Sequence, residues 1–407
     1  MDFVVLGIFV VVYLSMILGR LPGLALDRTG VVLVGAIAIV ATGRLDSQQA
    51  WDSVDIPTIG MLFGLMIVSA QFGSSGFYGQ VTTRLSVLQV SDRSLLLVVI
   101  VVTGVLSALL TNDIVVFAMT PVLIAGCAHR KLDPVPFLLG HMCAANIGSA
   151  ATLIGNPQVI FVGQRFNLGF SEYLIDAFVP VLISLVVSWA VICLVMRGSW
   201  SRDDSDIKAE LPEYLPYQAL KAVLAIAAIV LIFVITDWPH DVVALTVAGL
   251  LLMSRTLQSR RMLDMVDWQL LLLFIGLFIV NHAMDTSGTL KTLLDWLSST
   301  GVNLDNNVAL YITTAIASNV VSNVPAVMLL ANASGSDLAG PILAISSTLA
   351  GNLLLVGSLS NIIVLNQAER VGISITWGQH AKIGVPVGLI SLAVAGLWLW
   401  FRFGVLA

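Results

Sequence analysis

Residues 94–123 read SLLLVVIVVTGVLSALL, TND and IVVFAMTPVL, which are two apolar arms joined by a polar tripeptide. Asp113 ends this tripeptide and has more than a dozen largely apolar residues on either side. Irregular backbone and carboxylates at membrane depth are tolerated only where they face protein or a water-filled cavity. We therefore predict a re-entrant hairpin over about 94–128, which enters and leaves a membrane on one side.

The whole chain has the composition of a membrane protein. Of its 407 residues, 58% are hydrophobic and 11% are charged, and its mean hydropathy is +0.97. A soluble protein has about 25% charged residues, so a soluble enzyme is excluded. The net charge of -5 provides no basic surface, and we expect no nucleic-acid partner.

Sequence signatures of cofactors and metals are missing. No GxxxxGK[ST] loop occurs, so the chain itself does not hydrolyse ATP. Cys127, Cys143 and Cys193 are far apart and match neither a zinc pattern nor a disulfide framework. We expect no cofactor, no catalytic residue and no metal site.

Twelve apolar stretches predict how the chain lies in a lipid bilayer. Eight continuous runs approach the length that crosses about 30 Å of hydrocarbon: 3–19, 30–43, 57–72, 176–197, 218–236, 241–254, 268–284 and 379–402. Four stretches are interrupted by polar residues: 94–128, 137–163, 306–333 and 340–366. The first run lacks a basic leader and a cleavage site, so we expect it to be a retained helix.

The order of these stretches predicts two repeats, 1–197 and 218–407, joined by a hydrophilic cytoplasmic linker at 198–217. Residues of the first repeat recur 212 positions later in the second: Asp55, Gly64, Leu65, Ser75 and Gly76 correspond to Asp267, Gly276, Leu277, Ser287 and Gly288. In each repeat this helix is followed by an interrupted segment with a central Asn, then by a second interrupted segment. The shared order favours a duplication.

Charge predicts the orientation of the repeats. If 94–128 and 306–333 are hairpins, each repeat crosses the membrane an odd number of times, so the repeats are inverted. With both termini in the periplasm, about 15 basic residues face the cytoplasm and 4 face outside, as the positive-inside rule requires. The cytoplasmic residues are Arg20, Arg28, Arg84, Arg93, Arg130, Lys131, Arg197, Arg202, Lys208, Lys221, Arg255, Arg260, Arg261, Arg370 and Lys382.

The predicted fold is an all-α polytopic protein of the inner membrane with two inverted repeats. Each repeat has five crossing helices, one of them broken, and one re-entrant hairpin. The broken helices are expected at about 137–163 and 340–366, and the second hairpin at about 306–333. This is an architecture of secondary transporters.

The hairpin tips supply the first candidate site residues. A carboxylate at the depth of Asp113 is costly and is suited to binding and releasing a proton; alternatively it caps the second arm. No Lys or Arg lies deep in a span to neutralise it. Asn112 and Asn323 each offer a carbonyl acceptor and two amide donors, so they could orient a polar substrate from opposed tips. Thr111 and Pro325 complete the two tips, and Ser322 either binds substrate or only satisfies broken backbone.

The helix breaks supply the others. Gly155-Asn156-Pro157 interrupts the first broken helix, and Gly357-Ser358-Leu359-Ser360-Asn361 interrupts the second. Free N–H groups at such breaks favour a substrate oxygen, and free carbonyls favour a cation. Asn146, Ser149 and Thr152 precede the first break on one helix face. The candidate substrate-binding residues are Asn112, Thr152, Asn156, Ser322, Asn323, Ser358, Ser360 and Asn361.

Several motifs resemble the ion transporter superfamily, and within it the arsenite efflux membrane proteins (arsenical pump membrane proteins) and related inner-membrane anion permeases. They are LLTNDIVVFAMTP (109–121), IGNPQ (154–158), SNVVSNVPAVMLL (318–330), GSLSNIIV (357–364) and ISITWGQHAKIG (373–384). The resemblance implies inverted repeats whose hairpins and broken helices meet at mid-membrane. In the divalent-anion/sodium symporter relatives, a Ser-Asn-Thr tip holds sodium and a substrate carboxylate. Asp113 and Val324 depart from that motif, which favours the proton over sodium as the coupling ion.

We therefore expect a proton-coupled antiporter that extrudes arsenite and antimonite as neutral hydroxylated solutes by alternating access. Amide and hydroxyl groups would bind the solute, and Asp113 would carry the proton. A sodium- or proton-coupled symporter of a small dicarboxylate or inorganic anion is the main alternative, and a gated channel is a third. The sequence leaves open a homodimer and an associated ATPase subunit.

Overall fold

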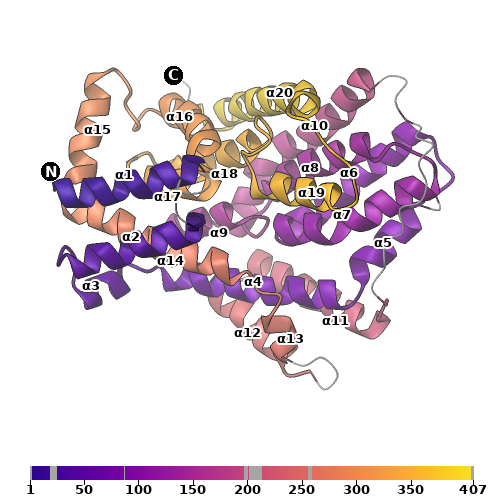
Figure 1. The fold of residues 1–407 in the computed structure, drawn as a ribbon, viewed down its shortest axis with the longest axis horizontal. Coiled ribbons are helices and arrows are strands. Elements are labelled where there is room, and N and C mark those ends of the chain that lie inside the picture. Colours follow the sequence, from indigo (N-terminus) through magenta and orange to yellow (C-terminus); the bar gives the residue numbers. More distant parts are fainter. Residues whose placement is uncertain are drawn as a thin grey trace.

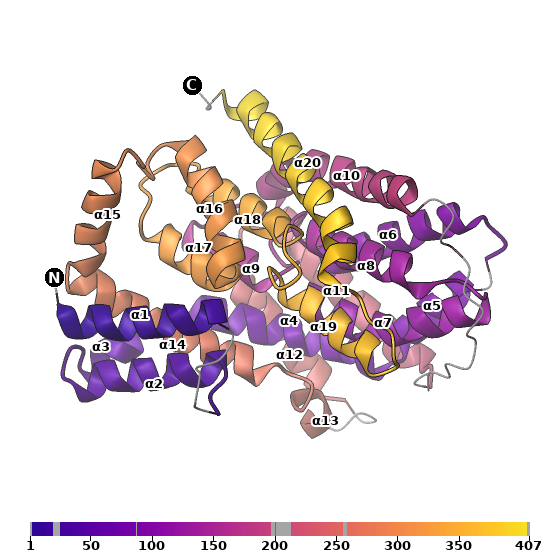
Figure 2. The ribbon, with the colours of Figure 1, turned by 45° about the horizontal axis from the view of Figure 1, so that its top comes forward.

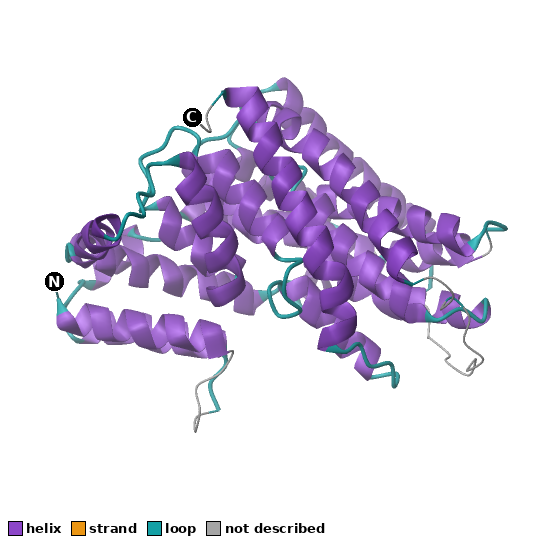
Figure 3. Cartoon of the chain, turned by 90° about the horizontal axis from the view of Figure 1, so that it is seen from above, coloured by secondary structure: helices purple, strands orange, loops and turns teal. Residues whose placement is uncertain are grey.

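A computed structural model describes residues 2–18, 25–86, 88–196, 200, 213–254 and 259–404. This part of the chain is helical and contains no extended strand (Figure 3). Most of the predicted linker 198–217 lies outside the described residues, as do five basic residues of the charge count: Arg20, Arg197, Arg202, Lys208 and Arg255.

Each continuous apolar run forms one helix. The first repeat contains α1 (Phe3–Leu18), α2 (Arg28–Ala41), α4 (Ile56–Ser74) and α10 (Phe170–Val195). The second contains α11 (Pro216–Ile235), α12 (His240–Leu252), α14 (Trp268–Thr286) and α20 (Trp377–Phe403). Among the described residues, seven helices are long and apolar enough to cross a membrane. The predicted all-helical membrane architecture is confirmed.

Helical hairpins occupy both predicted positions. The first consists of α6 (Asp92–Leu109) and α7 (Asn112–His129), and the second of α16 (Asn307–Val321) and α17 (Asn323–Ala331). The arms differ in length: α6 and α7 have 18 residues each, whereas α16 has 15 and α17 has 9. A single residue, Ser322, joins α16 to α17, and its φ of 78° lies in the left-handed region, which is unfavourable for a residue with a Cβ.

Both interrupted helices are broken, but the second break begins earlier than predicted: it spans residues 351–358, and Leu359, Ser360 and Asn361 lie in the first turn of the helix that follows. The first consists of α8 (Pro134–Ser149) and α9 (Pro157–Arg165), and the second of α18 (Ala339–Ala350) and α19 (Leu359–Glu369). Pro157 begins α9, where its missing N–H costs no helical hydrogen bond. Only a glycine fits at position 155 of the break, because a Cβ there would lie 2.3 Å from the carbonyl oxygen of Ser149.

The corresponding helices α4 and α14 begin and end alike. The side chains of Asp55 and Asp267 cap them, and each helix is followed by a glycine with φ 67°, at Gly76 and Gly288. Their closest helix crossings also correspond. A Cβ on Gly64 would lie 2.7 Å from the backbone of Ala244 in α12, and one on Gly276 would lie 2.5 Å from Val32 in α2. Both helices and both of their partners are thus related by the offset of 212.

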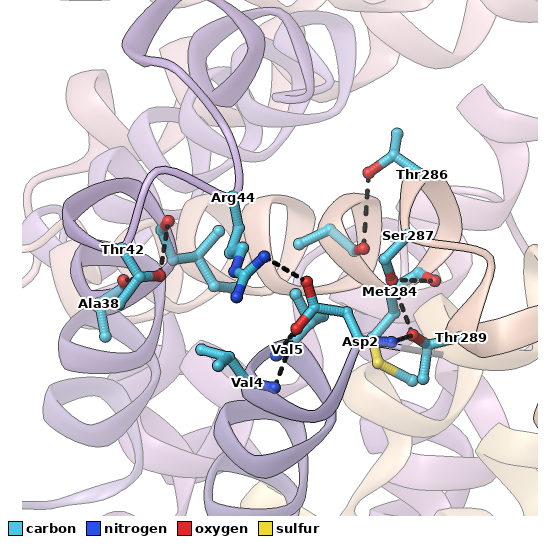
Figure 4. A network of polar contacts seen from close by, with 12 residues as sticks. Asp2, Val4, Val5, Ala38, Thr42, Arg44, Met284, Thr286, Ser287 and Thr289 are labelled. Atoms are coloured by element: carbon cyan, nitrogen blue, oxygen red, sulfur yellow. Dashed lines mark hydrogen bonds and ion pairs between the residues drawn. The ribbon is translucent and has the colours of Figure 1, made fainter.

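The ends of α4 and α14 lie at opposite faces of the molecule. Figure 4 shows Asp2, at the start of α1, in an ion pair with Arg44 at 2.8 Å and donating its N–H to Thr289, just after α14. In contrast, Leu215, just before α11, donates its N–H to the carbonyl of Ser75 at 2.9 Å. Helix α4 starts near the end of α2, on the face of Arg44, and runs away from it, whereas α14 ends on that face. The corresponding helices thus run in opposite directions, so the two repeats are inverted.

The repeats are also interleaved. Helices α1 and α2 pack on α14, and α11 and α12 pack on α4 (Figure 1). These helices form one part of the molecule. The hairpins, the broken helices, α10 and α20 form the other part of the molecule (Figures 1 and 2). The hairpin tips and the helix breaks come together on the side of this part that faces the first part.

Four short helices within the described ranges were not predicted. They are α3 (Ser47–Asp52), α5 (Phe77–Ser86), α13 (Ser259–Leu263) and α15 (Thr289–Ser299). Each follows the end of a span and is too short to cross a bilayer. None therefore contains the long apolar run on which the prediction of spans depended.

Candidate transport site

A cavity of about 290 Å³ with a partly polar lining lies where the hairpin tips meet the helix breaks. Both tips and both breaks contribute side chains to its wall: Asn112, Asp113, Pro157, Gln158, Ser322, Asn323, Pro325 and Ser358. All of these except Gln158 were singled out from the sequence. A larger cavity of about 920 Å³ lies between α16 and α20, but its lining is almost entirely apolar, so it offers few groups for binding a polar solute.

The first tip is bound to both repeats. Asn112 donates its backbone N–H to the carbonyl of Gly155 at 3.0 Å, which joins the tip to the first break. The Oδ1 atom of Asp113 accepts a hydrogen bond of 2.7 Å from the hydroxyl of Ser360 in α19. Thr111, and not Asp113, is the N-cap residue of α7, and it makes no capping bond through its side chain. The alternative role of Asp113 as a simple helix cap is therefore not what the geometry favours.

Both tip asparagines keep an unpaired acceptor. The Oδ1 atoms of Asn112 and Asn323 are buried and have no hydrogen-bond partner among the described residues. A buried polar atom without a partner costs about 1–3 kcal/mol, and native proteins rarely retain one without a reason. Both residues line the cavity, but the two oxygens themselves have almost no accessible area. A ligand with hydrogen-bond donors that entered between the tips would satisfy both oxygens once a small movement exposed them.

Asn146 connects the two broken helices. Its Nδ2 donates to Oδ1 of Asn352 at 2.9 Å and to Oδ1 of Asn361 at 3.1 Å. Its Oδ1 accepts from the hydroxyl of Ser358 at 2.7 Å. Ser358 has one hydroxyl proton and uses it here, so toward any other group its oxygen can only accept. The sequence placed Asn146 near the first break but did not predict these bonds across the repeats.

Asn156 holds the first break together and does not line the cavity. Its Oδ1 caps α9 by accepting the N–H of Val159 at 3.0 Å. Its Nδ2 donates to Oγ of Ser149 at 2.9 Å and to Oγ1 of Thr348 at 3.2 Å. The side-chain groups proposed for substrate are thus used within the protein, and a direct substrate contact is not what the structure favours.

Three other candidates also lie behind the cavity wall. The hydroxyl of Thr152 donates to the carbonyl of Ala108 in the first hairpin. Thr152 therefore does not share the helix face with Asn146 and Ser149 that was expected for it. Ser360 reaches Asp113, and Asn361 donates to the carbonyl of Gly351 at 3.0 Å. These residues support the site, while Gly155 and Gly357 allow the close backbone approaches around it.

The mouth of the cavity has charges that sequence reasoning missed. Asp27, Arg28 and Thr29 of the segment that opens α2 line it, together with Asp267 and Gln269 at the start of α14. We expected no basic residue in the site, yet Arg28 is part-buried there. With Asp113, the lining carries three carboxyl groups and one guanidinium. Asp267 was noted only as a repeat position, and no local pattern distinguishes Arg28.

Inverted repeats in a helical membrane body, with polar tips and breaks around one cavity, define a membrane transporter. The chain belongs to the citrate transporter family (CitMHS), whose family model matches residues 10–339.

Relatives cover almost the whole chain. A 46 kDa membrane protein of Mycobacterium leprae is 27% identical, over 100% of both chains. The silicon efflux transporter LSI3 of rice, Oryza sativa subsp. japonica, is 25% identical and covers 97% of this chain and 96% of its own. The crystal structure of the Alcanivorax borkumensis YdaH transporter, described as having an unusual topology, matches 98% of each chain with a TM-score of 0.56 and 12% identity. This last likeness concerns the fold alone.

Proposed function

We propose that the chain extrudes a small, neutral, hydroxylated solute of the arsenite and antimonite class in exchange for protons. The observation that carries this proposal is the pair of unpaired Oδ1 atoms of Asn112 and Asn323 beside Asp113. An undissociated acid with several hydroxyl groups donates hydrogen bonds, which is what these acceptors lack among the described residues. It also carries no charge to be repelled by an excess of carboxyl groups.

Asp113 would couple the solute to the proton. Ser360 occupies one carboxyl oxygen, which leaves the other for either a solute hydroxyl or a proton. An ionised Asp113 accepts the solute at one face of the membrane, and protonation at the other face displaces it. The protonated site then returns and loses its proton, so each outward transfer of solute brings a proton inward.

The cavity mouth would face the cytoplasm. Arg28, beside Asp27 and Asp267, belongs to the face that the positive-inside count assigns to the cytoplasm, with both termini in the periplasm. A mouth on that side suits the loading step of an efflux protein. The rice relative, named for silicon efflux, supports export of an inorganic solute.

A symporter of a small carboxylate anion is the second candidate. Arg28 at the mouth favours it, since a guanidinium binds a carboxylate through paired hydrogen bonds, and the family is described by citrate transport. Against it stand the three carboxyl groups in the same lining, which disfavour a multiply charged anion.

Flux into everted inner-membrane vesicles distinguishes the two candidates. We expect respiring vesicles to accumulate radiolabelled arsenite, a protonophore to abolish the uptake, and sodium to have no effect. Vesicles lacking the protein provide the baseline. Uptake of labelled citrate or succinate without uptake of arsenite would refute the antiporter and support the symporter.

A further inference from the structure

The tip of the second hairpin is bound to the part of the molecule that contains α1 and α14. Tyr13 of α1 is buried, and α1 packs against α16 of this hairpin. Its hydroxyl lies 3.0 Å from Oδ1 of Asn281 in α14 and 3.3 Å from the carbonyl oxygen of Pro325. Pro325 lies two residues after Asn323 and lines the cavity with it. One hydroxyl thus connects both helices to the tip.

Within the described part of the chain, the first tip lacks such a connection. Asn281 is offset by 212 from Ser69 in α4, whose hydroxyl lies 3.5 Å from that of Thr111. Equivalent positions of α4 and α14 are therefore linked to the two tips, Ser69 directly and Asn281 through Tyr13. The position equivalent to Tyr13 in α11 is Ala225, whose side chain has no polar group. The long pair at 3.5 Å is weaker than the bonds of Tyr13, so the two tips are held with different strengths in this conformation.

We propose that Tyr13 is a positioning residue that holds the second hairpin tip in the conformation whose cavity opens beside Asp27, Arg28 and Asp267. The inference rests on the alternating access of the proposed function. The hydroxyl has one proton, which the amide oxygen of Asn281 and the carbonyl of Pro325 share. When the tip moves, the bond to Pro325 breaks and Asn281 keeps the proton. The latch is therefore reversible without leaving a buried hydroxyl unpaired.

Cysteine labelling measures this latch without any substrate. Ser322→Cys, introduced with Cys193→Ala in the full chain, places a thiol in the cavity wall; Cys127 and Cys143 are buried. A membrane-impermeant maleimide is applied to everted and to right-side-out vesicles, and the ratio of the two labelling rates is compared between variants. For Tyr13→Phe we expect labelling from the mouth side to fall about three-fold relative to labelling from the other side, as the loss of one modest hydrogen bond would cause.

Two further variants keep the test specific. Tyr78→Phe removes another buried tyrosine hydroxyl, one that has no partner among the described residues, and should leave the ratio unchanged. Asn281→Leu removes the competing acceptor, so the proton goes to Pro325 and the ratio should stay or shift toward the mouth side. An unchanged ratio in Tyr13→Phe, an equal shift in Tyr78→Phe, or an Asn281→Leu shift like that of Tyr13→Phe would each overturn the latch. A failure of arsenite flux would refute the proposed function but not this inference.

Discussion

The carboxyl group of Asp113 is held from outside its own hairpin, because Ser360 of the other repeat donates to it. The unpaired amide oxygens of Asn112 and Asn323 lie in the two tips on either side of the same cavity. This arrangement places one titratable group next to acceptors that do not titrate. In the proposed exchange, proton and solute compete at a single carboxyl oxygen while the amides hold the solute.

Asp113→Asn tests that competition. The amide still accepts from Ser360 but binds no proton, so we expect proton-driven arsenite uptake to fall at least about ten-fold and to lose its pH dependence. Exchange of labelled for unlabelled arsenite should continue, because it needs no net proton movement and the new amide N–H can donate to a solute oxygen in place of the lost acceptor. Asp46→Asn, which replaces one good N-cap residue by another on α3, is the control. Wild-type proton-driven uptake in Asp113→Asn would rule out its role as proton carrier.

At the scale of elements, the first break depends on backbone contacts that leave no space for a side chain. A Cβ on Gly155 would lie 2.3 Å from the carbonyl oxygen of Ser149 and 2.8 Å from that of Ser107. Neither carbonyl can move without shifting α8 or α6, and the tip residue Asn112 is bonded to the carbonyl of Gly155 itself. Break and tip therefore form one unit.

Gly155→Ala should disrupt this unit. We expect loss of transport and a lower thermal unfolding midpoint in detergent, by an amount equivalent to about 2 kcal/mol or more, since overpacking of a tight site typically has such a cost. Gly249→Ala in α12, where no described atom lies within 4 Å of the added methyl group, should unfold at or above the wild-type midpoint. If both variants behave alike, close packing at the break is not required.

At the scale of the molecule, the repeats depend on each other for burial. Helices α1 and α2 pack on α14 of the other repeat, while α11 and α12 pack on α4. The N-terminal segment is bonded beside the end of α14, and the segment before α11 is bonded beside the end of α4. Neither repeat would bury its central helix alone, so the inverted halves fold as one body.

Labelling of single cysteines tests the orientation of this body. Arg44 and Arg261 are exposed and lie at predicted opposite faces. In a Cys193→Ala background, Arg44→Cys should react with an impermeant maleimide only in right-side-out vesicles, and Arg261→Cys only in everted ones. Reaction of both from one side would contradict the inverted topology, and a reversed pattern would contradict periplasmic termini.

Span positions, hairpins and helix breaks were predictable from the sequence. A long apolar run without charge is stable only in lipid or in a large core, and Gly155-Asn156-Pro157 breaks a helix through local backbone chemistry. These are properties of neighbouring residues. The shortness of α17 was not predictable, because its end at Ala331 depends on packing.

The division of labour among the polar residues required the tertiary structure. Asn112, Asp113, Asn323 and Ser358 line the cavity, whereas Asn156 and Thr152, of similar chemistry and in similar motifs, bond to the protein. Their partners are distant in sequence, and so are the residues bonded to Asn146. Composition and periodicity report burial and backbone geometry, but which donor meets which acceptor depends on how two inverted halves pack, and that is decided only when both are folded together.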